Sequence, residues 1–197
     1  QFCTQPGITV ATDTPELQSL IDELAEDFAE TPKGTMLTDR IAKNFSQGAA
    51  ELIGRTGVEP VGETVSAEEP LVPGKPLLVK TTGKIFLSDP DLKKEVFGPV
   101  TLLVVAENST ELRQIAASFQ GELTASVFGE EEELIRETEL LDLLTERAGR
   151  VICNGFPTGV KVCHSMQHGG PFPATTNSRE TSVGTAAIKR FLRPVCF

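Results

Sequence analysis

Cys3 is the residue in this sequence that is best placed to form a covalent intermediate. It stands in QFCTQPG at positions 1–7, where turn-forming residues follow it. An ionised thiol is a strong nucleophile, and its reaction needs a base for the proton and donors for the oxyanion that its attack creates. A single cysteine is more often an ordinary packing residue. With His164 or His168 as the base, Cys3 could also serve a thiol hydrolase.

Glu95 and Phe97 form a second group that could do chemistry, within EVFGPV at positions 95–100. The structural alternative is that Glu95 caps or pairs with Lys93 or Lys94 and that Phe97 lies in the core.

Phe156 and Thr158 lie in NGFPTG, a loop after a predicted strand, where ordinary loop packing accounts for such residues. Three potential metal ligands, Cys163, His164 and His168, fall within six residues without a second cluster. That spacing fits no common zinc site, so we predict no metal. The other cysteines, Cys153, Cys163 and Cys196, stand in apolar contexts that predict packing.

The composition is that of a globular domain and restricts the partners. The chain has 197 residues, 39% hydrophobic and 23% charged, with a net charge of -10. An acidic surface repels nucleic acid and anionic membranes, which favours a small molecule or another protein as partner. Four scattered cysteines suit a reducing compartment, and no apolar run could span a bilayer. We therefore expect a cytoplasmic protein that binds neither nucleic acid nor membrane.

Helix signals dominate the first part of the chain. Thr14, Pro15 and Glu16 are typical of a helix start, and apolar residues follow at three-and-four spacing. These inward residues are Leu17, Leu20, Ile21, Leu24 and Phe28. A second helix is predicted over 38–54, ending at a glycine. Its inward residues are Ile41, Phe45, Ala49, Leu52 and Ile53.

Strands and helices alternate later in the chain. After an irregular stretch over 58–76, residues 77–79 predict a strand, 82–84 a hairpin-like break and 85–87 its continuation. Apolar residues 101–106 predict a strand buried on both faces. Helices are then expected over 109–119 and 130–148, and strands over 123–128 and 150–153. This order indicates an α/β fold with a mainly parallel sheet flanked by helices.

About thirty residues after Asn154 have little periodicity and many Gly, Pro, Ser and Thr residues, which is typical of functional loops. Residues 183–189 indicate a short helix. Residues 191–197 predict an exposed terminal strand, and an unpaired edge of that kind finds a partner.

Three ordered stretches resemble the aldehyde dehydrogenase superfamily: QFCTQPG, EVFGPV, and a run from GRVICNG at 149–155 through HGGP to TSVGT at 181–185. The resemblance covers nearly the whole chain and implies the catalytic domain of that fold. It implies that Cys3 attacks an aldehyde to give a thiohemiacetal, with its own N–H as one oxyanion donor. Hydride then passes to NADP or NAD, and water hydrolyses the thioester. Glu95 and Phe97 then contact the nicotinamide ribose and ring, and Phe156 and Thr158 wall the substrate pocket.

The resemblance also implies what the chain lacks. In that family a glutamate base, an asparagine oxyanion donor and the dinucleotide-binding domain precede the cysteine, and no G-x-G-x-x-G replaces them here. We therefore expect residues 1–190 to be a catalytic domain that is inactive by itself. Residues 191–197 are then the start of an oligomerisation strand in a homo-oligomer.

The branch of the family can also be suggested from the sequence. MQHGGPFPATT at 166–176 and RFLRPVCF at 190–197 most resemble the branch that oxidises α-ketoglutarate semialdehyde to α-ketoglutarate, whose relatives include fatty aldehyde dehydrogenases. The alternatives are a stand-alone Cys/His thiol hydrolase and a non-catalytic assembly domain.

Overall fold

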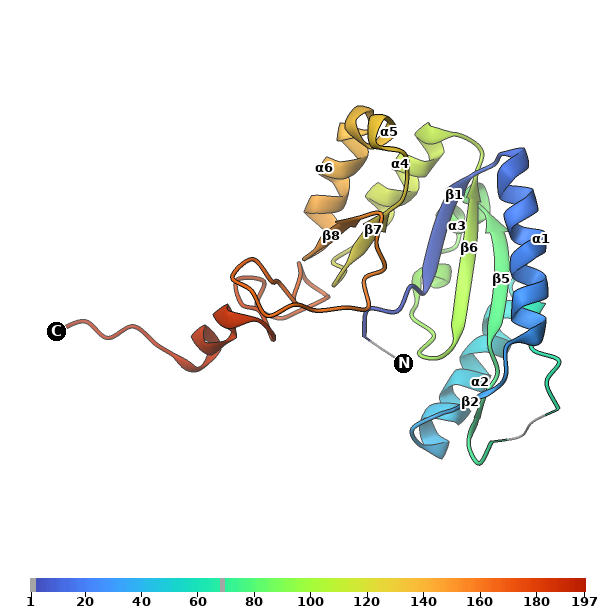
Figure 1. Cartoon of the computed structure of the whole chain (residues 1–197), viewed down its shortest axis with the longest axis horizontal. Helices are drawn as coiled ribbons and strands as arrows, with labels where there is room; N and C mark the ends of the chain where they lie inside the picture. The colour runs from blue at the N-terminus through green and yellow to red at the C-terminus, as the bar shows by residue number, and fades with distance from the viewer. Residues whose placement is uncertain (1–2, 68–69) are drawn as a thin grey trace. The chain divides into compact units, whose positions relative to one another are not determined.

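A computed structural model describes residues 3–67 and 70–197 (Figure 1), so the first two residues of the QFCTQPG motif lie outside the described part. The chain divides into two compact units. The first unit comprises residues 6–115, and the second comprises residues 116–197 together with 3–5. Each unit holds part of the candidate chemistry, with Cys3 in the second and Glu95 and Phe97 in the first.

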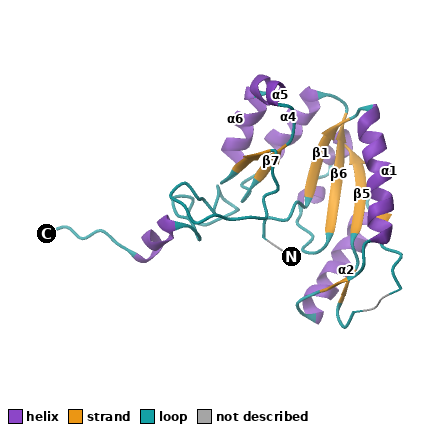
Figure 2. Cartoon of the chain, viewed as in Figure 1, coloured by secondary structure: helices purple, strands orange, loops and turns teal. Residues whose placement is uncertain are grey.

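A four-stranded sheet organises the first unit (Figure 2). Its order is β1 (Ile8–Thr12), β6 (Val100–Ala106), β5 (Leu77–Thr82) and β3 (Glu59–Glu63). The first three strands are parallel, and β3 joins the edge antiparallel. Val79 and Val104 are fully buried, so the central strands are covered on both faces as their apolar runs predict. The mainly parallel sheet of an α/β fold is confirmed.

Two capped helices pack in the first unit. In α1 (Pro15–Glu30) Thr14 accepts the N–H of Leu17, and Leu17 and Ile21 pack on Leu78 and Leu103 of the sheet. Helix α2 (Asp39–Ile53) begins after Thr38 and ends at Gly54, as predicted.

Two residues that were expected to face inward on these helices do not. Leu20 is 49% exposed and Ile53 is 37% exposed. Both stand at the margin of an apolar stripe that is wider than the surface it covers. A separate antiparallel pair is formed by β2 (Gly34–Thr35) and β4 (Pro73–Gly74).

The predicted hairpin-like break at 82–84 is wrong. Residues Gly83–Ser88 form the helix α3, and Thr82 caps it by accepting the N–H of Ile85. The physical reason is topological: β5 and β6 run parallel, so the chain between them must cross over rather than turn back.

The second unit contains a parallel strand pair, β7 (Ala125–Val127) and β8 (Val151–Cys153). Helix α4 (Ser109–Ser118) crosses the boundary between the units. The single helix expected over 130–148 is two helices, α5 (Glu131–Arg136) and α6 (Thr138–Arg147). Glu137, with φ -87° and ψ 43°, leaves the helical conformation between them.

The terminal strand predicted over 191–197 is not formed in this chain. A 3₁₀ helix, η2 (Thr185–Phe191), replaces the short helix expected at 183–189, and the residues after it pair with no strand. A strand needs a partner edge, and a single chain offers none to this segment. Its role in joining subunits stays a prediction. Among the described helices, none has the length and apolar character that crossing a membrane requires.

Candidate functional site

Cys3 faces a histidine from the distant end of the chain. Its side chain is exposed, while the next residue, Thr4, is only 6% exposed and fixes the segment. Cys3 Sγ lies 3.3 Å from His168 Nε2, and both residues belong to the second unit. A thiol and an imidazole at this distance can exchange a proton.

The main chain of His168 is held on both sides. Its N–H donates to Thr181 Oγ1 at 2.8 Å, and its carbonyl accepts from both the N–H and the hydroxyl of Ser182 at 3.0 Å. Thr181 is only 3% exposed and donates its own hydroxyl to the Val183 carbonyl at 2.8 Å. These bonds fix the main chain from which the imidazole projects toward Cys3.

The two glycines after His168 explain how this segment fits. A Cβ on Gly170 would collide with the carbonyl of Glu122, and a Cβ on Gly169 would collide with the carbonyl of Glu180 and the side-chain amide of Gln167. Backbone therefore approaches backbone at both positions, which only glycine permits. The HGG sequence is required for packing as well as for presenting the imidazole.

A pocket of about 260 Å³ lies beside His168. It is lined by Leu123, His168, Thr175, Thr176, Asn177, Glu180, Ser182 and Arg190. His168 Nδ1 is buried and has no hydrogen-bond partner among the described residues. The carboxylate of Glu180 lies 3.8 Å from Arg190 Nε.

Phe156 and Thr158 lie on a loop that Arg150 holds in place. The Arg150 guanidinium donates to the carbonyls of Pro157 and Gly159, each at 2.7 Å. Phe156 is 75% exposed, and its ring centroid lies 5.5 Å from that of Phe128. Both candidates are thus on the surface of the second unit, and their role at a substrate stays a prediction. Arg150 had no signal of its own in the sequence.

Glu95 and Phe97 are exposed because the residues that alternate with them, Val96 and Gly98, pack inward. Val96 contacts Gly48 of α2, and Gly98 lies so close to the ring of Phe45 that a Cβ there would collide with it. Glu95, just before Val96, and Phe97, between Val96 and Gly98, are both exposed, Phe97 by 46%. Phe97 is therefore not the core residue that the alternative required.

Both lysines beside Glu95 have other partners. Lys94 Nζ lies 2.8 Å from Asp91 Oδ1, and Lys93 Nζ lies over the Phe86 ring at 5.5 Å from its centroid. Lys94 therefore pairs with Asp91 and Lys93 lies over Phe86, so neither forms the ion pair with Glu95 that was its alternative role. An exposed carboxylate beside an exposed flat ring suits a ribose diol and a nicotinamide ring.

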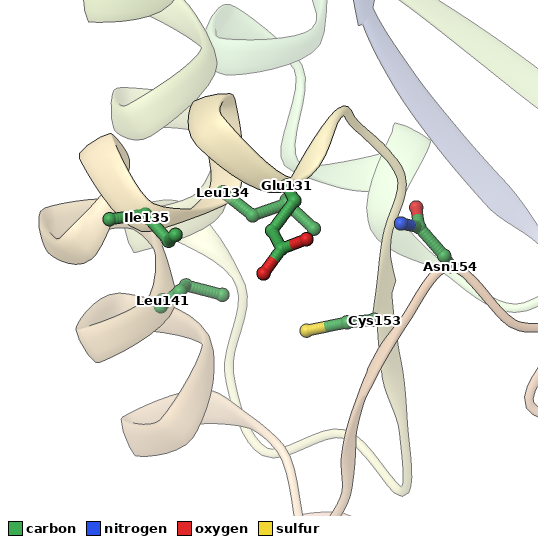
Figure 3. A pocket seen from close by; sticks show the side chains of 6 residues that line it. All are labelled: Glu131, Leu134, Ile135, Leu141, Cys153 and Asn154. Atoms are coloured by element: carbon green, nitrogen blue, oxygen red, sulfur yellow. The ribbon is translucent and has the colours of Figure 1, made fainter.

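The remaining cysteines are not buried as expected. Cys153 and Cys196 are exposed and Cys163 is partly buried, because Cys153 ends a three-residue strand and Cys196 lies in the irregular terminal segment. Figure 3 shows Cys153 at a pocket of about 430 Å³, opposite the apolar side chains of α5 and α6. Its lining residues are Glu131, Leu134, Ile135, Leu141, Cys153 and Asn154.

Cys163 and His164 each have a local partner. The Ser165 hydroxyl beside Cys163, with a smaller contribution from Lys161, lowers the pKa of that thiol. His164 Nδ1 lies 3.1 Å from Thr185 Oγ1, so of the two histidines it is His168 that faces Cys3. In the described part of the chain, no three His, Cys, Asp or Glu side chains are grouped as metal ligands.

Known proteins resemble this chain in sequence and in fold. No family model matches it. Over its whole length it is 40% identical to alpha-ketoglutaric semialdehyde dehydrogenase 2 of Azospirillum brasilense, but it spans only 37% of that relative.

Among solved structures, proline utilization A from Bdellovibrio bacteriovorus superposes on the whole of this chain with a TM-score of 0.81 and 19% sequence identity. The superposed part is 20% of that structure's own chain. Succinic semialdehyde dehydrogenase from Streptococcus pyogenes, solved with NADP+, covers 86% of this chain and 37% of its own, with a TM-score of 0.66 at 17% identity.

Proposed function

We propose that this chain belongs to the aldehyde dehydrogenase superfamily, as its relatives at 40% and 39% identity indicate, and that it carries the nucleophile of an NAD(P)-dependent enzyme that oxidises an aldehyde to a carboxylic acid. The substrate proposed is α-ketoglutarate semialdehyde, because the relative at 40% identity is named for it. The observation that carries the proposal is an exposed Cys3, within a family motif, in a chain that matches this relative over its whole length.

The chain's own residues would perform the covalent steps. The thiolate of Cys3 would add to the aldehyde carbon while the Cys3 N–H donates to the new oxyanion. Loss of hydride from the thiohemiacetal leaves a thioester on Cys3. Water then attacks the thioester carbon, the acid is released and the thiol is restored.

Glu95 and Phe97 would hold the nicotinamide half of the cofactor, NADP or NAD. The carboxylate would accept hydrogen bonds from the ribose hydroxyls and the ring would lie beside the nicotinamide. When bound, the dinucleotide supplies the hydride acceptor. The NADP+ complex of the streptococcal relative supports a nicotinamide cofactor in this family.

The proposal also assigns a role to each segment of the chain. Residues 1–190 would form the catalytic domain, with Phe156 and Thr158 at the aldehyde, and residues 191–197 would begin a strand that joins subunits. In the family that the chain resembles, the glutamate base and most of the dinucleotide site belong to a segment before the cysteine. That segment is not among these 197 residues. We therefore expect these 197 residues to lack dehydrogenase turnover by themselves.

The test measures NAD(P)H production by the full-length protein with α-ketoglutarate semialdehyde. Cys3→Ala is expected to lower kcat by about a thousandfold or more, because the covalent route is lost. Cys153→Ala removes an exposed thiol elsewhere and is the matched control. Normal turnover in Cys3→Ala would refute the assignment, and turnover only with other aldehydes would refute the substrate.

The contact between Cys3 and His168 favours one alternative, a thiol hydrolase that needs no dinucleotide. Hydrolysis of p-nitrophenyl acetate without NAD(P), by the 197-residue chain, distinguishes the two functions. Robust multiple turnover that depends on Cys3, with no dehydrogenase activity in the full-length protein, would establish the hydrolase. A non-catalytic assembly domain would show neither activity.

Assembly through the terminal segment can be tested separately. Light scattering on the full-length protein and on a variant truncated after Leu192 should show loss of subunit association when the segment is removed. An unchanged mass would exclude residues 193–197 from the interface.

A further inference from the structure

Lys93 and Lys94 stand directly before Glu95, the carboxylate that is proposed to bind the nicotinamide ribose. Lys94 is the nearer of the two, and its side chain is 74% exposed. An ammonium on a flexible four-carbon stem can reach the carboxylate of the next residue, where it would take acceptor capacity that ribose hydroxyls need. A ribose site at Glu95 therefore requires another partner for Lys94.

Asp91 is the partner that the structure provides. It belongs to a 3₁₀ helix, η1 (Pro90–Lys93), in the first unit. Lys94 Nζ lies 2.8 Å from Asp91 Oδ1, and the Lys94 N–H donates to the Asp91 carbonyl at 3.1 Å. Lys94 and Arg55 keep the pKa of Asp91 below its ordinary value, so this carboxylate is ionised at neutral pH.

Arg55 holds the other oxygen of the same carboxylate. One nitrogen of its guanidinium contacts Asp91 Oδ2 and another contacts Asp89 Oδ2, each at 2.8 Å. Asp89 Oδ1 in turn accepts the main-chain N–H of Asp91 at 3.0 Å. A planar guanidinium thus sets two carboxylates at once, and it leaves Asp91 Oδ1 to the ammonium of Lys94.

The main chain of Arg55 is anchored as well. It follows the end of α2, where its N–H donates to the Leu52 carbonyl and its carbonyl accepts the N–H of Val58, each at 3.2 Å. The Thr81 hydroxyl donates to the Gly57 carbonyl at 2.8 Å and so ties this turn to β5. The guanidinium therefore starts from a turn that the sheet holds in place.

We propose that Asp91 is a positioning residue of the nicotinamide site: it occupies the ammonium of Lys94 and so keeps the carboxylate of Glu95 available to the ribose. This inference rests on the proposed function, in which Glu95 accepts hydrogen bonds from the nicotinamide ribose. Arg55 supports the role because it fixes the second oxygen of Asp91. The consequence is tighter binding of NAD(P), since Lys94 does not compete for Glu95.

The first measurement is the dissociation constant of NADPH or NADH for the full-length protein at low salt, from the fluorescence of the reduced nicotinamide. Asp91→Asn removes the charge and leaves one acceptor oxygen for two cations. We expect it to weaken binding about threefold, a size typical of one exposed ion pair. Adding Lys94→Gln to Asp91→Asn should restore the unsubstituted affinity, because no ammonium remains to compete. Equally weak binding in this double variant would overturn the inference.

Lys93→Gln is the matched control, because Lys93 lies over the Phe86 ring instead of at Asp91. Added to Asp91→Asn, it should leave binding weak. Restoration by Lys93→Gln as well would indicate an effect of net charge and would refute a specific role for Lys94. Lys94→Gln by itself should not weaken binding. A loss there would mean that the ammonium serves the cofactor directly, contrary to the inference.

The second measurement repeats the titrations as salt is raised. Salt screens the attraction between an exposed ammonium and a carboxylate, so the ratio of the two dissociation constants, Asp91→Asn to unsubstituted, should fall toward one between about 0.05 M and about 1 M NaCl. A ratio that does not change with salt would point to altered structure and refute the role. Urea unfolding should show the double variant no more stable than Asp91→Asn. Recovered stability would mean that recovered binding reflects refolding, which also counts against the role.

The proposed function and this inference fail separately. Glu95→Ala tests the proposed function, because it removes the acceptor of the ribose hydroxyls. If Glu95→Ala binds NADPH and NADH normally, the ribose contact is wrongly assigned and the inference falls with it. If Glu95→Ala weakens binding and Asp91→Asn does not, only the role of Asp91 is refuted.

Discussion

Cys3 Sγ and His168 Nε2 lie 3.3 Å apart although 165 positions separate them in the chain. The contact needs both the anchored turn after Cys3 and the glycine-assisted packing of residues 168–170. Neither segment could hold the pair alone, because each supplies one of the two groups. The nucleophile of this chain is thus a product of its tertiary structure.

His168→Asn should reduce the reactivity of Cys3. Asparagine cannot accept the thiol proton, so we expect alkylation of Cys3 at neutral pH to fall about tenfold or more. Mass spectrometry of tryptic peptides after timed iodoacetamide treatment measures each cysteine separately. His164→Asn is the control, since His164 contacts Thr185 instead. Equal effects of the two substitutions would show that the contact with Cys3 is not what matters.

Gly98→Ala should disturb the surface that presents Glu95 and Phe97. A Cβ at this position collides with the ring of Phe45, a core residue only 4% exposed. Overpacking of this kind costs about 1–3 kcal/mol, so urea unfolding should show a lower midpoint. Gly34→Ala, where a Cβ meets nothing within 4 Å, is the control. A full-length Gly98→Ala protein should also bind NAD(P) more weakly, which fluorescence titration can measure.

Much of the helical structure could be predicted because its signals are local. Thr14 and Thr38 cap helices whose apolar spacing is visible within a few turns. Strand β1 could not be predicted from the local sequence, because its pairing partner is remote in the chain: Ile8 pairs with Leu102 in β6. The crossover helix α3 was mistaken for a turn because a short Thr-Gly-Lys sequence suits either, and only the parallel pairing of β5 and β6 decides between them.

The candidate site divides in the same way. Cys3, Glu95 and Phe97 could be chosen from short motifs, and the structure shows all three side chains exposed. His168 was considered as a base only alongside His164, because a sequence cannot tell which imidazole reaches the sulfur. Arg150, which holds the loop of Phe156, leaves no local signal since its acceptors are main-chain carbonyls.

Asp91→Asn should make stability less dependent on pH at the acid end. Lys94 and Arg55 both hold the pKa of Asp91 below its ordinary value of 3.8. A lowered folded-state pKa stabilises the protein above the ordinary value, and that contribution is lost as the pH falls through the lower folded value. Urea midpoints of the unsubstituted and Asp91→Asn chains should therefore differ at about pH 6 and converge as the pH falls through the lowered folded-state pKa of Asp91. Asp142→Asn, on an exposed helix position, should show no such convergence.

Ser165→Ala should make Cys163 less reactive near neutral pH. The Ser165 hydroxyl, 3.4 Å from the sulfur, contributes most to the lowered pKa of Cys163, and Lys161 adds to it. A lowered pKa means a larger thiolate fraction at a given pH, and only the thiolate is alkylated. Cys163 should therefore begin to react at a lower pH than Cys196 as the pH is raised. In Ser165→Ala its rate should fall severalfold near pH 7 and match the unsubstituted chain at about pH 10, where thiols are largely ionised. A deficit that persists at high pH would instead indicate that the substitution blocks access to the sulfur.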